Sequence, residues 1–235
     1  RFMPCCCSFS KKAYLKPKPQ VLVITNYRPD QQQSMLRFGD LLISKKNTHS
    51  NFDFQEISPS PIFWMACLAK RFQKWAAYID KYILFPKRLK RKFLKQKDPV
   101  HLIHITDHSN AIYLPKLSRF TRTKKIITCH DLIAIRTAKG EFNQAPKISI
   151  SGKRLQSWIL NSLVLADYYA CDSRQTLEDL NWLIPRSREK SSIVHLGAEL
   201  DLSQKLDRED LSKKLPLAPH NTNFLLHVGS SAWYK

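Results

Sequence analysis

Short apolar runs rich in β-branched residues recur along the chain, and amphipathic segments separate them. The run QVLVITNY predicts a buried strand at 20–27, and similar runs predict strands at 52–58, 100–105, 124–129, 167–172, 191–197 and 223–229. Apolar spacings of three and four residues predict helices between them, after Pro29 and at 109–117, 152–166 and 174–184. Repeated strand–helix alternation predicts an α/β protein with a Rossmann-like, doubly wound parallel sheet.

The ends of the chain differ in composition from this alternating region. Residues 1–19 are basic and cysteine-rich and predict a poorly ordered lead-in. Residues 20–197 hold six of the predicted strands and form one domain. Residues 198–222 are polar, charged and proline-bearing, which is typical of a linker. The strand at 223–229 then begins a further segment, 223–235.

A long segment at 62–97 has a composition of its own. Its apolar residues share one helical face, and Pro86 is expected to end or kink the helix. Between residues 70 and 97 only Asp80 is acidic, whereas Lys and Arg are abundant. Two interpretations remain open: the stripe packs on the sheet while the lysines face water, or the helix lies at an anionic membrane surface. The stripe consists of Leu68, Phe72, Trp75, Ile79 and Tyr82.

The net charge of the whole chain also bears on whether it binds an anionic partner. The formal net charge is +20 over 235 residues, which favours an anionic partner or simply a basic solvated surface. A basic module that binds nucleic acid or anionic membrane without catalysis is therefore the alternative to an enzyme. No sequence signature of a nucleic-acid-binding fold supports a specific nucleic-acid partner.

The remaining composition narrows the function classes. Five glycines provide neither a dinucleotide-binding fingerprint nor a P-loop. The six cysteines form neither a disulfide framework nor a zinc pattern, which favours the reducing cytoplasm, and Cys5–Cys7 fit a frayed tail or a palmitoylated one. No run has the length of a membrane span, about 18–20 residues. His101 and His104 point to opposite faces of a strand, so we expect no metal site.

Polar residues follow five of the predicted strands. Ligands of open α/β sheets bind outside the carboxyl ends of the strands, so these residues are candidates for a site. His130 could carry a proton near neutral pH, and an ordinary structural hydrogen bond is an equally good interpretation. Asp131 is expected to orient a neighbour or cap a helix. The other candidates for lining the cleft are Tyr27, Arg28, Asp107, His108 and Ser173.

Five stretches in this order resemble the family-4-type glycosyltransferases. They are HITDHSNAIYL, IITCHDLIAIR, LADYYACDSRQTLEDL, SSIVHLGAEL and FLLHVGSSAWYK, and the resemblance spans about 20–235. That family combines two Rossmann-like domains in the GT-B arrangement. The resemblance implies that this chain is the N-terminal, acceptor-binding half plus the start of a truncated donor-binding domain.

The resemblance also implies an activity. The family transfers a sugar from a nucleotide-sugar donor to an acceptor, with retention of configuration and without a cofactor or tightly bound metal. His130 matches the family's histidine near the reacting sugar, and Gly229 and Lys235 match its contacts to the donor diphosphate. The acceptor is unknown, with lipid-linked intermediates and polysaccharides as the candidates, and the location is expected to be cytoplasmic or peripheral at the inner membrane face.

Two departures from the family pattern bear on this expectation. Ser230 stands where an arginine commonly follows the glycine, which removes one diphosphate contact. The family's acidic pair that holds the donor belongs to a part beyond Lys235. We therefore expect a truncated enzyme with little or no transferase activity alone.

Overall fold

The computed structural model describes residues 18–44, 51–67, 69–95 and 99–197. Their centre is a six-stranded parallel sheet with the strand order β2-β1-β3-β4-β5-β6. The strands are β1 (Gln20–Ile24), β2 (Asp53–Ile57), β3 (Val100–Ile105), β4 (Lys124–Cys129), β5 (Tyr168–Cys171) and β6 (Ser191–Ile193). The predicted α/β, Rossmann-like parallel sheet is thus confirmed, and each of these strands lies within its predicted range.

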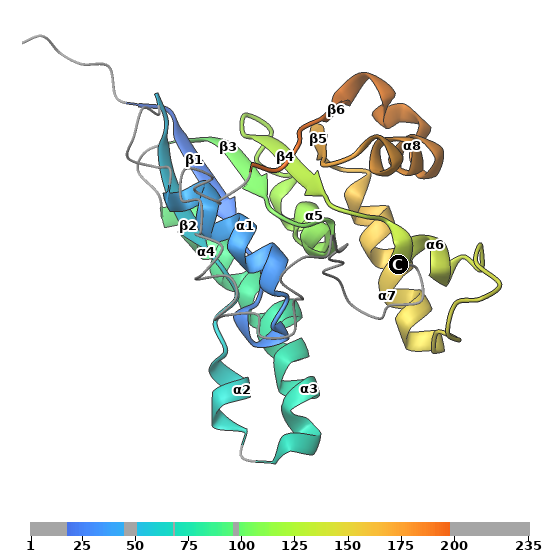
Figure 1. The fold of residues 1–235 in the computed structure, drawn as a ribbon. Coiled ribbons are helices and arrows are strands. Elements are labelled where there is room, and N and C mark those ends of the chain that lie inside the picture. The colour runs from blue at the N-terminus through green and yellow to red at the C-terminus, as the bar shows by residue number, and fades with distance from the viewer. Residues whose placement is uncertain (1–17, 45–50, 68, 96–98, 198–235) are drawn as a thin grey trace, which may run out of the picture.

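Helices connect the strands (Figure 1). The α-helices are α1 (Gln33–Ser44), α2 (Ile62–Ala66), α3 (Lys70–Ile79), α4 (Phe85–Lys95), α5 (Leu114–Leu117), α6 (Ile133–Ala138), α7 (Ile150–Leu163) and α8 (Arg174–Leu183). A π-helical turn, η3 (Asp80–Leu84), joins α3 to α4, and 3-10 turns are η1 (Arg28–Asp30), η4 (His108–Tyr113) and η5 (Pro185–Lys190).

The core lies on one face of the sheet. Alternate residues of the strands, such as Ile24, Ile105 and Ile127, point to this face and are fully buried. Phe85 and Leu89 of α4 pack in the same cluster, together with side chains of η4, α5, α7 and α8. Burial of side chains of this size contributes about 1.5–3 kcal/mol each, so this layer dominates the stability of the fold.

The opposite face of the sheet is covered less completely. Helix α1 lies on it, close enough that a Cβ at Gly39 would stand 2.9 Å from Cγ2 of Thr25. Crossovers between parallel strands are right-handed, so the direction in which a crossover runs across the sheet decides which face its helix covers. The β1→β2 crossover runs in one direction and all later crossovers run in the other. Helix α1 of the β1→β2 crossover therefore covers this face, and the helices of the later crossovers cover the core face. Tyr168 and Val194 near the β6 edge are therefore about half exposed, although burial on both faces was expected.

Pro86 lies inside a helix and does not end it. The irregularity expected there occurs one turn earlier, in η3, where the N–H of Phe85 donates to the carbonyl of Asp80 five residues back. Proline lacks an N–H and its ring clashes with the preceding turn of a regular α-helix. The wider π turn accommodates this defect, so α4 continues to Lys95.

The predicted apolar stripe of 62–97 joins the core only at its C-terminal end, where Tyr82 packs against the core cluster. Leu68, its first residue, lies outside the described residues. Phe72 and Trp75 are 51% and 65% exposed, whereas the buried residues of α3 are Ala76 and Ala77. Helices α2 and α3 form a pair that projects away from the sheet (Figure 1). Helical spacing correctly predicted an amphipathic helix, but the interpretation that this stripe packs on the sheet is wrong for Phe72 and Trp75.

Candidate functional site: a polar rim beside an apolar cavity

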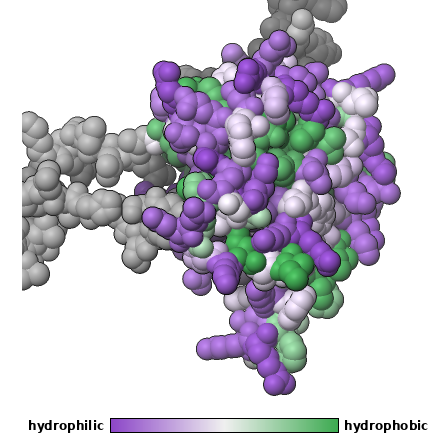
Figure 2. All heavy atoms as spheres, turned by 90° about the vertical axis from the view of Figure 1, so that its right-hand side faces the viewer, coloured by the Kyte–Doolittle hydropathy of each residue, from purple (hydrophilic) through white to green (hydrophobic). Residues whose placement is uncertain are grey.

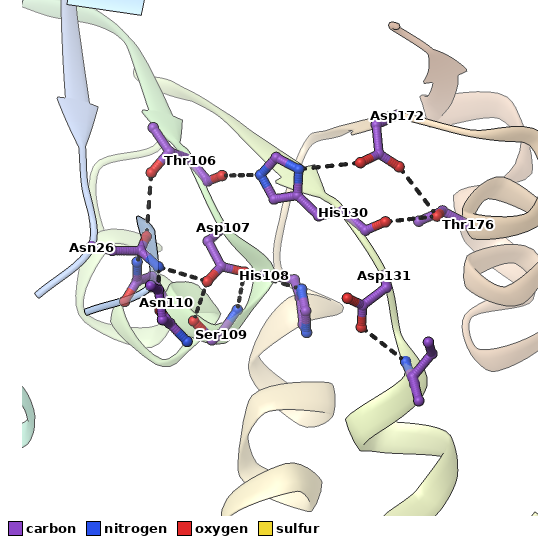
Figure 3. A network of polar contacts seen from close by, with 12 residues as sticks. Asn26, Thr106, Asp107, His108, Ser109, Asn110, His130, Asp131, Asp172 and Thr176 are labelled. Atoms are coloured by element: carbon purple, nitrogen blue, oxygen red, sulfur yellow. Dashed lines mark hydrogen bonds and ion pairs between the residues drawn. The ribbon is translucent and has the colours of Figure 1, made fainter. Parts of the chain in front are cut away.

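The carboxyl ends of β1, β3, β4 and β5 bring a set of polar side chains together (Figure 3). Because the strands are parallel, residues that follow them meet at one rim of the sheet. The set extends through continuous hydrogen bonds from Asn26 after β1 to Asp172 after β5. Its members come from segments up to about 150 residues apart in sequence, so only the fold assembles them.

Asp107 is the best-bonded carboxylate of the rim. It is 3% exposed, and its oxygens accept hydrogen bonds from the side chain of Asn26 (2.8 Å) and from the N–H and hydroxyl of Ser109 (3.1 and 2.6 Å). Burial alone would raise the pKa of Asp107, but His108 and these hydrogen bonds together hold it well below its ordinary value. The group is therefore a fixed negative charge at neutral pH.

His108 is the counter-charge of Asp107. Its Nδ1 lies 3.1 Å from the carboxylate, off the ideal direction of a hydrogen bond, and has no other partner. Burial favours the neutral ring, yet Asp107, and more weakly Asp131, raise the pKa of His108. The short distance to Asp107 and the charges of both carboxylates favour the protonated ring, so Asp107 and His108 form a buried pair at the end of β3.

His130 follows β4 and is held at both ring nitrogens. Nε2 donates to the carbonyl of Thr106 at 3.0 Å, and Nδ1 lies 3.2 Å from a carboxylate oxygen of Asp172. The edge of the Phe38 ring packs on it at 5.0 Å between ring centres. A protonated ring can donate to both partners, whereas a neutral ring donates to one only. The imidazole is thereby fixed in orientation, with its nitrogens directed along the rim.

The adjacent pair His130–Asp131 separates in the structure. Asp131 is exposed, and its side chain accepts from the N–H of Ile133 at the start of α6 (Figure 3). Ser173, a candidate for lining the cleft, caps α8 by accepting from the N–H of Thr176. Thr176 in turn donates to the carbonyl of His130, so α8 buttresses the rim.

The two candidates after β1 lie in different surroundings. Tyr27 is buried, and its hydroxyl donates to Asp80 at 2.9 Å; desolvation first, and then Asp80, raise the pKa of this hydroxyl well above its usual range. Arg28 is exposed and pairs with Asp40 on α1 at 2.9 Å. Tyr27 thus faces the α2–α3 projection, and Arg28 faces solvent beside α1.

An apolar cavity of about 380 Å³ lies on the partly covered face of the sheet, beneath α1. This volume is in the range of small-molecule sites. Phe38, which contacts His130, also lines the cavity and so connects it to the rim. His104 at its floor bonds to the hydroxyl of Thr128 at 2.9 Å. Burial first, and then His130, lower the pKa of His104 to about 4, so the floor is neutral at pH 7.

Sequence reasoning missed several residues of this site. Asn26, Thr106 and Asp172 were visible as polar positions after strands, but nothing in the sequence gave the strand order that makes them partners. For Phe38 and His104 the sequence predicted only that they belong to a helix and a strand, and not that they lie near the site. The cavity depends on a face left uncovered by the crossovers, which the local pattern does not record.

Some predicted features lie outside the described residues. Gly229 and Lys235, the expected donor contacts, belong to them, as do 1–17 of the lead-in, the linker 198–222 and the segment 223–235. Within the described ranges, no group of three or more His, Cys, Asp or Glu residues is arranged to hold a metal ion. Among the same residues, no helix combines the length and apolar character needed to cross a bilayer.

Comparison with known proteins gives a likeness at the level of fold. No model of a protein family and no curated protein matches the sequence. Among solved structures, the chain is similar to TcCGT1 in complex with UDP, with a TM-score of 0.51 and 12% identity over 86% of this chain and 56% of that chain. UGT89C1 of Arabidopsis thaliana, complexed with UDP-L-rhamnose, gives a TM-score of 0.47 and 15% identity over 86% and 55%.

Only the similarity to TcCGT1, with its TM-score of 0.51, is used for the assignment of the fold. The chain spans little more than half the length of the structures it matches. At 12% identity the similarity shows the fold alone. The matched structures are UDP-glycosyltransferases of GT-B fold, which supports the GT-B part of the expectation and not the family-4 type. The described residues thus share a Rossmann-like α/β fold with part of TcCGT1.

Proposed function

We propose that this chain forms the acceptor-binding half of a glycosyltransferase that uses a nucleotide-sugar donor. The observation that carries the proposal is a fixed polar rim directly beside an apolar cavity, at the carboxyl edge of a parallel sheet. The rim offers charges and hydrogen-bonding groups for a polar reacting end, and the cavity offers space for the apolar part of an acceptor. The GT-B likeness supports the reaction class.

The residue roles follow from this arrangement. His130 is the candidate for contact with the reacting groups, because it is the rim residue that borders both Asp172 and the cavity residue Phe38. Asp107 and His108 act as a buried ion pair that fixes the β3 end of the rim. Gly229 and Lys235 remain the proposed contacts of the donor diphosphate, where a lysine would stabilise charge developing on the leaving phosphate.

Finer features of the proposal rest on the family-4 resemblance. They are retention of configuration at the transferred sugar, no resident cofactor or metal, and a chain that is a fragment with little activity alone. A cytoplasmic location and a lipid-linked or polysaccharide acceptor belong to the same set. The alternative of a basic module without catalysis is not favoured, because this fold likeness points to glycosyltransferases.

The test is sugar transfer by the natural protein that contains this chain. Radiolabelled nucleotide sugars are supplied with apolar and lipid-linked acceptors, and the product's anomeric configuration is determined by NMR. His130→Ala is expected to lower kcat/KM by about 10²-fold or more, the usual loss for a positioned acid–base group. Lys116→Gln, an exposed residue of α5, serves as the control and should change nothing.

Three results are decisive. Absence of both transfer and donor hydrolysis with every nucleotide sugar would contradict the proposed reaction. Inversion at the sugar would leave the transferase in place and overturn retention. Full activity of His130→Ala would remove this histidine from contact with the reacting groups.

A further inference from the structure

The projection formed by α2 and α3 exposes a group of large apolar side chains. Met65 is 72% exposed and Ile62 is 59% exposed, in addition to Phe72 and Trp75 described above. Phe63 belongs to the same group at 47%. These residues belong to α2 and α3, two helices that contact each other and project together from the sheet (Figure 1). Contiguous exposed apolar groups of this kind mark interaction surfaces.

The segment that carries this apolar group is rich in basic residues. Figure 2 shows hydrophilic and apolar side chains side by side at the lower end of the molecule, where α2 and α3 lie. Asp80 is the one acidic residue of 69–95, and it is buried. Its oxygens accept from the hydroxyl of Tyr27 and from the N–H groups of Phe63 and Trp64, so it leaves the surface positive. Lys81 is largely buried and pairs with Asp30 at 2.7 Å. The other basic residues of 69–95 are Lys70, Arg71, Lys74, Lys87, Arg88, Lys90, Arg91, Lys92 and Lys95.

A cavity of about 370 Å³ lies at the base of the projection. Ile62 of the apolar group and Lys87, Arg88 and Arg91 of α4 line it. Asp80 lines it too, but both oxygens of this carboxylate already accept hydrogen bonds from within the protein. Arg88 also donates to the hydroxyl of Ser60 at its edge. An anion in this cavity would be attracted by the charges of Lys87, Arg88 and Arg91.

We propose that the α2–α3 projection docks on an anionic lipid bilayer, with its apolar side chains in the interface and a lipid phosphate in the cavity lined by Lys87, Arg88 and Arg91. Basic amphipathic segments with Trp and Phe bind such surfaces by combining apolar burial with attraction to headgroups. The cavity adds a defined site for one phosphate, which guanidinium groups recognise through paired hydrogen bonds.

Two other occupants fit the surface less well. A second copy of this chain would bring the same basic residues against one another, so like charges would oppose the contact. Nucleic acid would suit the cations and the aromatic rings, but Ile62 and Met65 have no stacking or polar function to offer it. An interface with both a negative surface and an apolar interior satisfies both sets of side chains.

The test is binding of the natural protein to vesicles of phosphatidylcholine alone and with one third phosphatidylglycerol, measured by sedimentation. Binding is expected with the anionic vesicles and is expected to weaken as salt is raised. Arg88→Gln with Arg91→Gln should weaken partitioning by about 30-fold, about fivefold for each charge removed near the surface. Met65→Ser should also weaken it, and brominated lipid should quench tryptophan fluorescence less in Trp75→Phe.

Matched control variants distinguish binding by this surface from nonspecific binding that depends only on net charge or on exposed apolar side chains. Arg188→Gln with Lys190→Gln removes two exposed cations from η5, and Ile150→Ser removes an apolar side chain with the same 72% exposure as Met65. Both should bind like the unchanged protein, and circular dichroism verifies that every variant is folded. Equal losses in the control variants, or no preference for anionic over neutral vesicles, would overturn the proposal.

Further arms address the alternative occupants. Inorganic phosphate at millimolar concentration should compete only weakly, because it lacks the apolar contribution. Full competition by phosphate, or loss of vesicle binding in favour of duplex DNA at equal charge concentration, would overturn the lipid assignment. Vesicle binding does not depend on sugar transfer, so its outcome is independent of the proposed enzymatic function.

Discussion

His130 and Asp131 are neighbours in sequence but take different partners. His130 turns to Thr106 and Asp172, on the strands beside its own, whereas Asp131 turns to the backbone of the following helix. By contrast, Asp107 and His108 are neighbours that do pair. At the residue scale, the direction of each side chain at the strand end decides the partner, and sequence adjacency alone does not.

The Asp107–His108 pair predicts a pH window of stability. The raised pKa of His108 contributes stability that is complete below the ordinary value of 6.5 and is lost as pH rises through the raised value. The depressed pKa of Asp107 contributes stability that is complete above the ordinary 3.8 and is lost as pH falls. The pair therefore acts fully between about pH 4 and 6.5.

Replacement of His108 by Gln should remove this contribution. We expect a loss of about 1–3 kcal/mol in the free energy of unfolding near pH 5.5, the usual cost of leaving a buried polar group without its partner, and a smaller loss at pH 9. Urea denaturation from pH 5 to 9 measures both. The Asp107→Asn and double variants complete a cycle, and additive losses would show that the two residues do not act as a pair.

At the scale of elements, Asp80 anchors the α2–α3 projection. It is 1% exposed and ties the start of α2 and the end of β1 to the π turn through three hydrogen bonds. The single acidic residue of a basic segment thus has a structural task. An exposed apolar surface is kept in place by a buried polar contact at its base.

Removing this anchor should loosen the projection. Asp80→Ala leaves one buried and two partly buried donors without an acceptor and should lower the free energy of unfolding by about 3 kcal/mol. Tyr27→Phe removes one donor and should cost about 1 kcal/mol. Limited proteolysis should cut Asp80→Ala earlier between α2 and α3. Equal behaviour of the two variants would contradict the anchoring role of the backbone contacts.

The sequence predicted the positions of the strands and helices better than it predicted which residues pack against them. Strands such as 20–27 and 124–129 were readable because buried parallel strands are continuous apolar runs. The 72–75 aromatics were misplaced because helical spacing records that a face is apolar and not what covers it. At the rim, the position of Asp107 and His130 after buried strands is confirmed. The contacts of Asp172 and Asp80 span distant segments, and no local pattern contains them.

At the scale of the molecule, the strand order leaves one sheet face open beside α1. The crossovers after β2 all run in one direction, so their helices cover the core face. The other face keeps the cavity lined by Phe38, Phe54, His104, Thr128 and Ala170 among others. The proposed acceptor site is thus a direct result of topology.

Filling this cavity should block an apolar ligand. Ala170→Phe places a ring in the space and should weaken binding of a fluorescent apolar probe at least tenfold, a change of about 1.4 kcal/mol. Ser192→Phe, on the same face but exposed and outside the cavity lining, is the control. Unchanged probe affinity in Ala170→Phe, measured by fluorescence titration, would show that the cavity is not the binding place.

The π turn at Asp80–Leu84 sets the rotational phase between α3 and α4. Each residue of an α-helix advances its side chains by about 100°, and a π turn introduces roughly one residue beyond the regular repeat. Deleting one residue from this turn would allow α3 and α4 to form one regular α-helix. The same deletion would rotate Phe72 and Trp75 around the helix axis by about a quarter turn or more. Evolution could thus re-aim the whole projection by a single codon insertion or deletion, without altering any side chain that the projection carries.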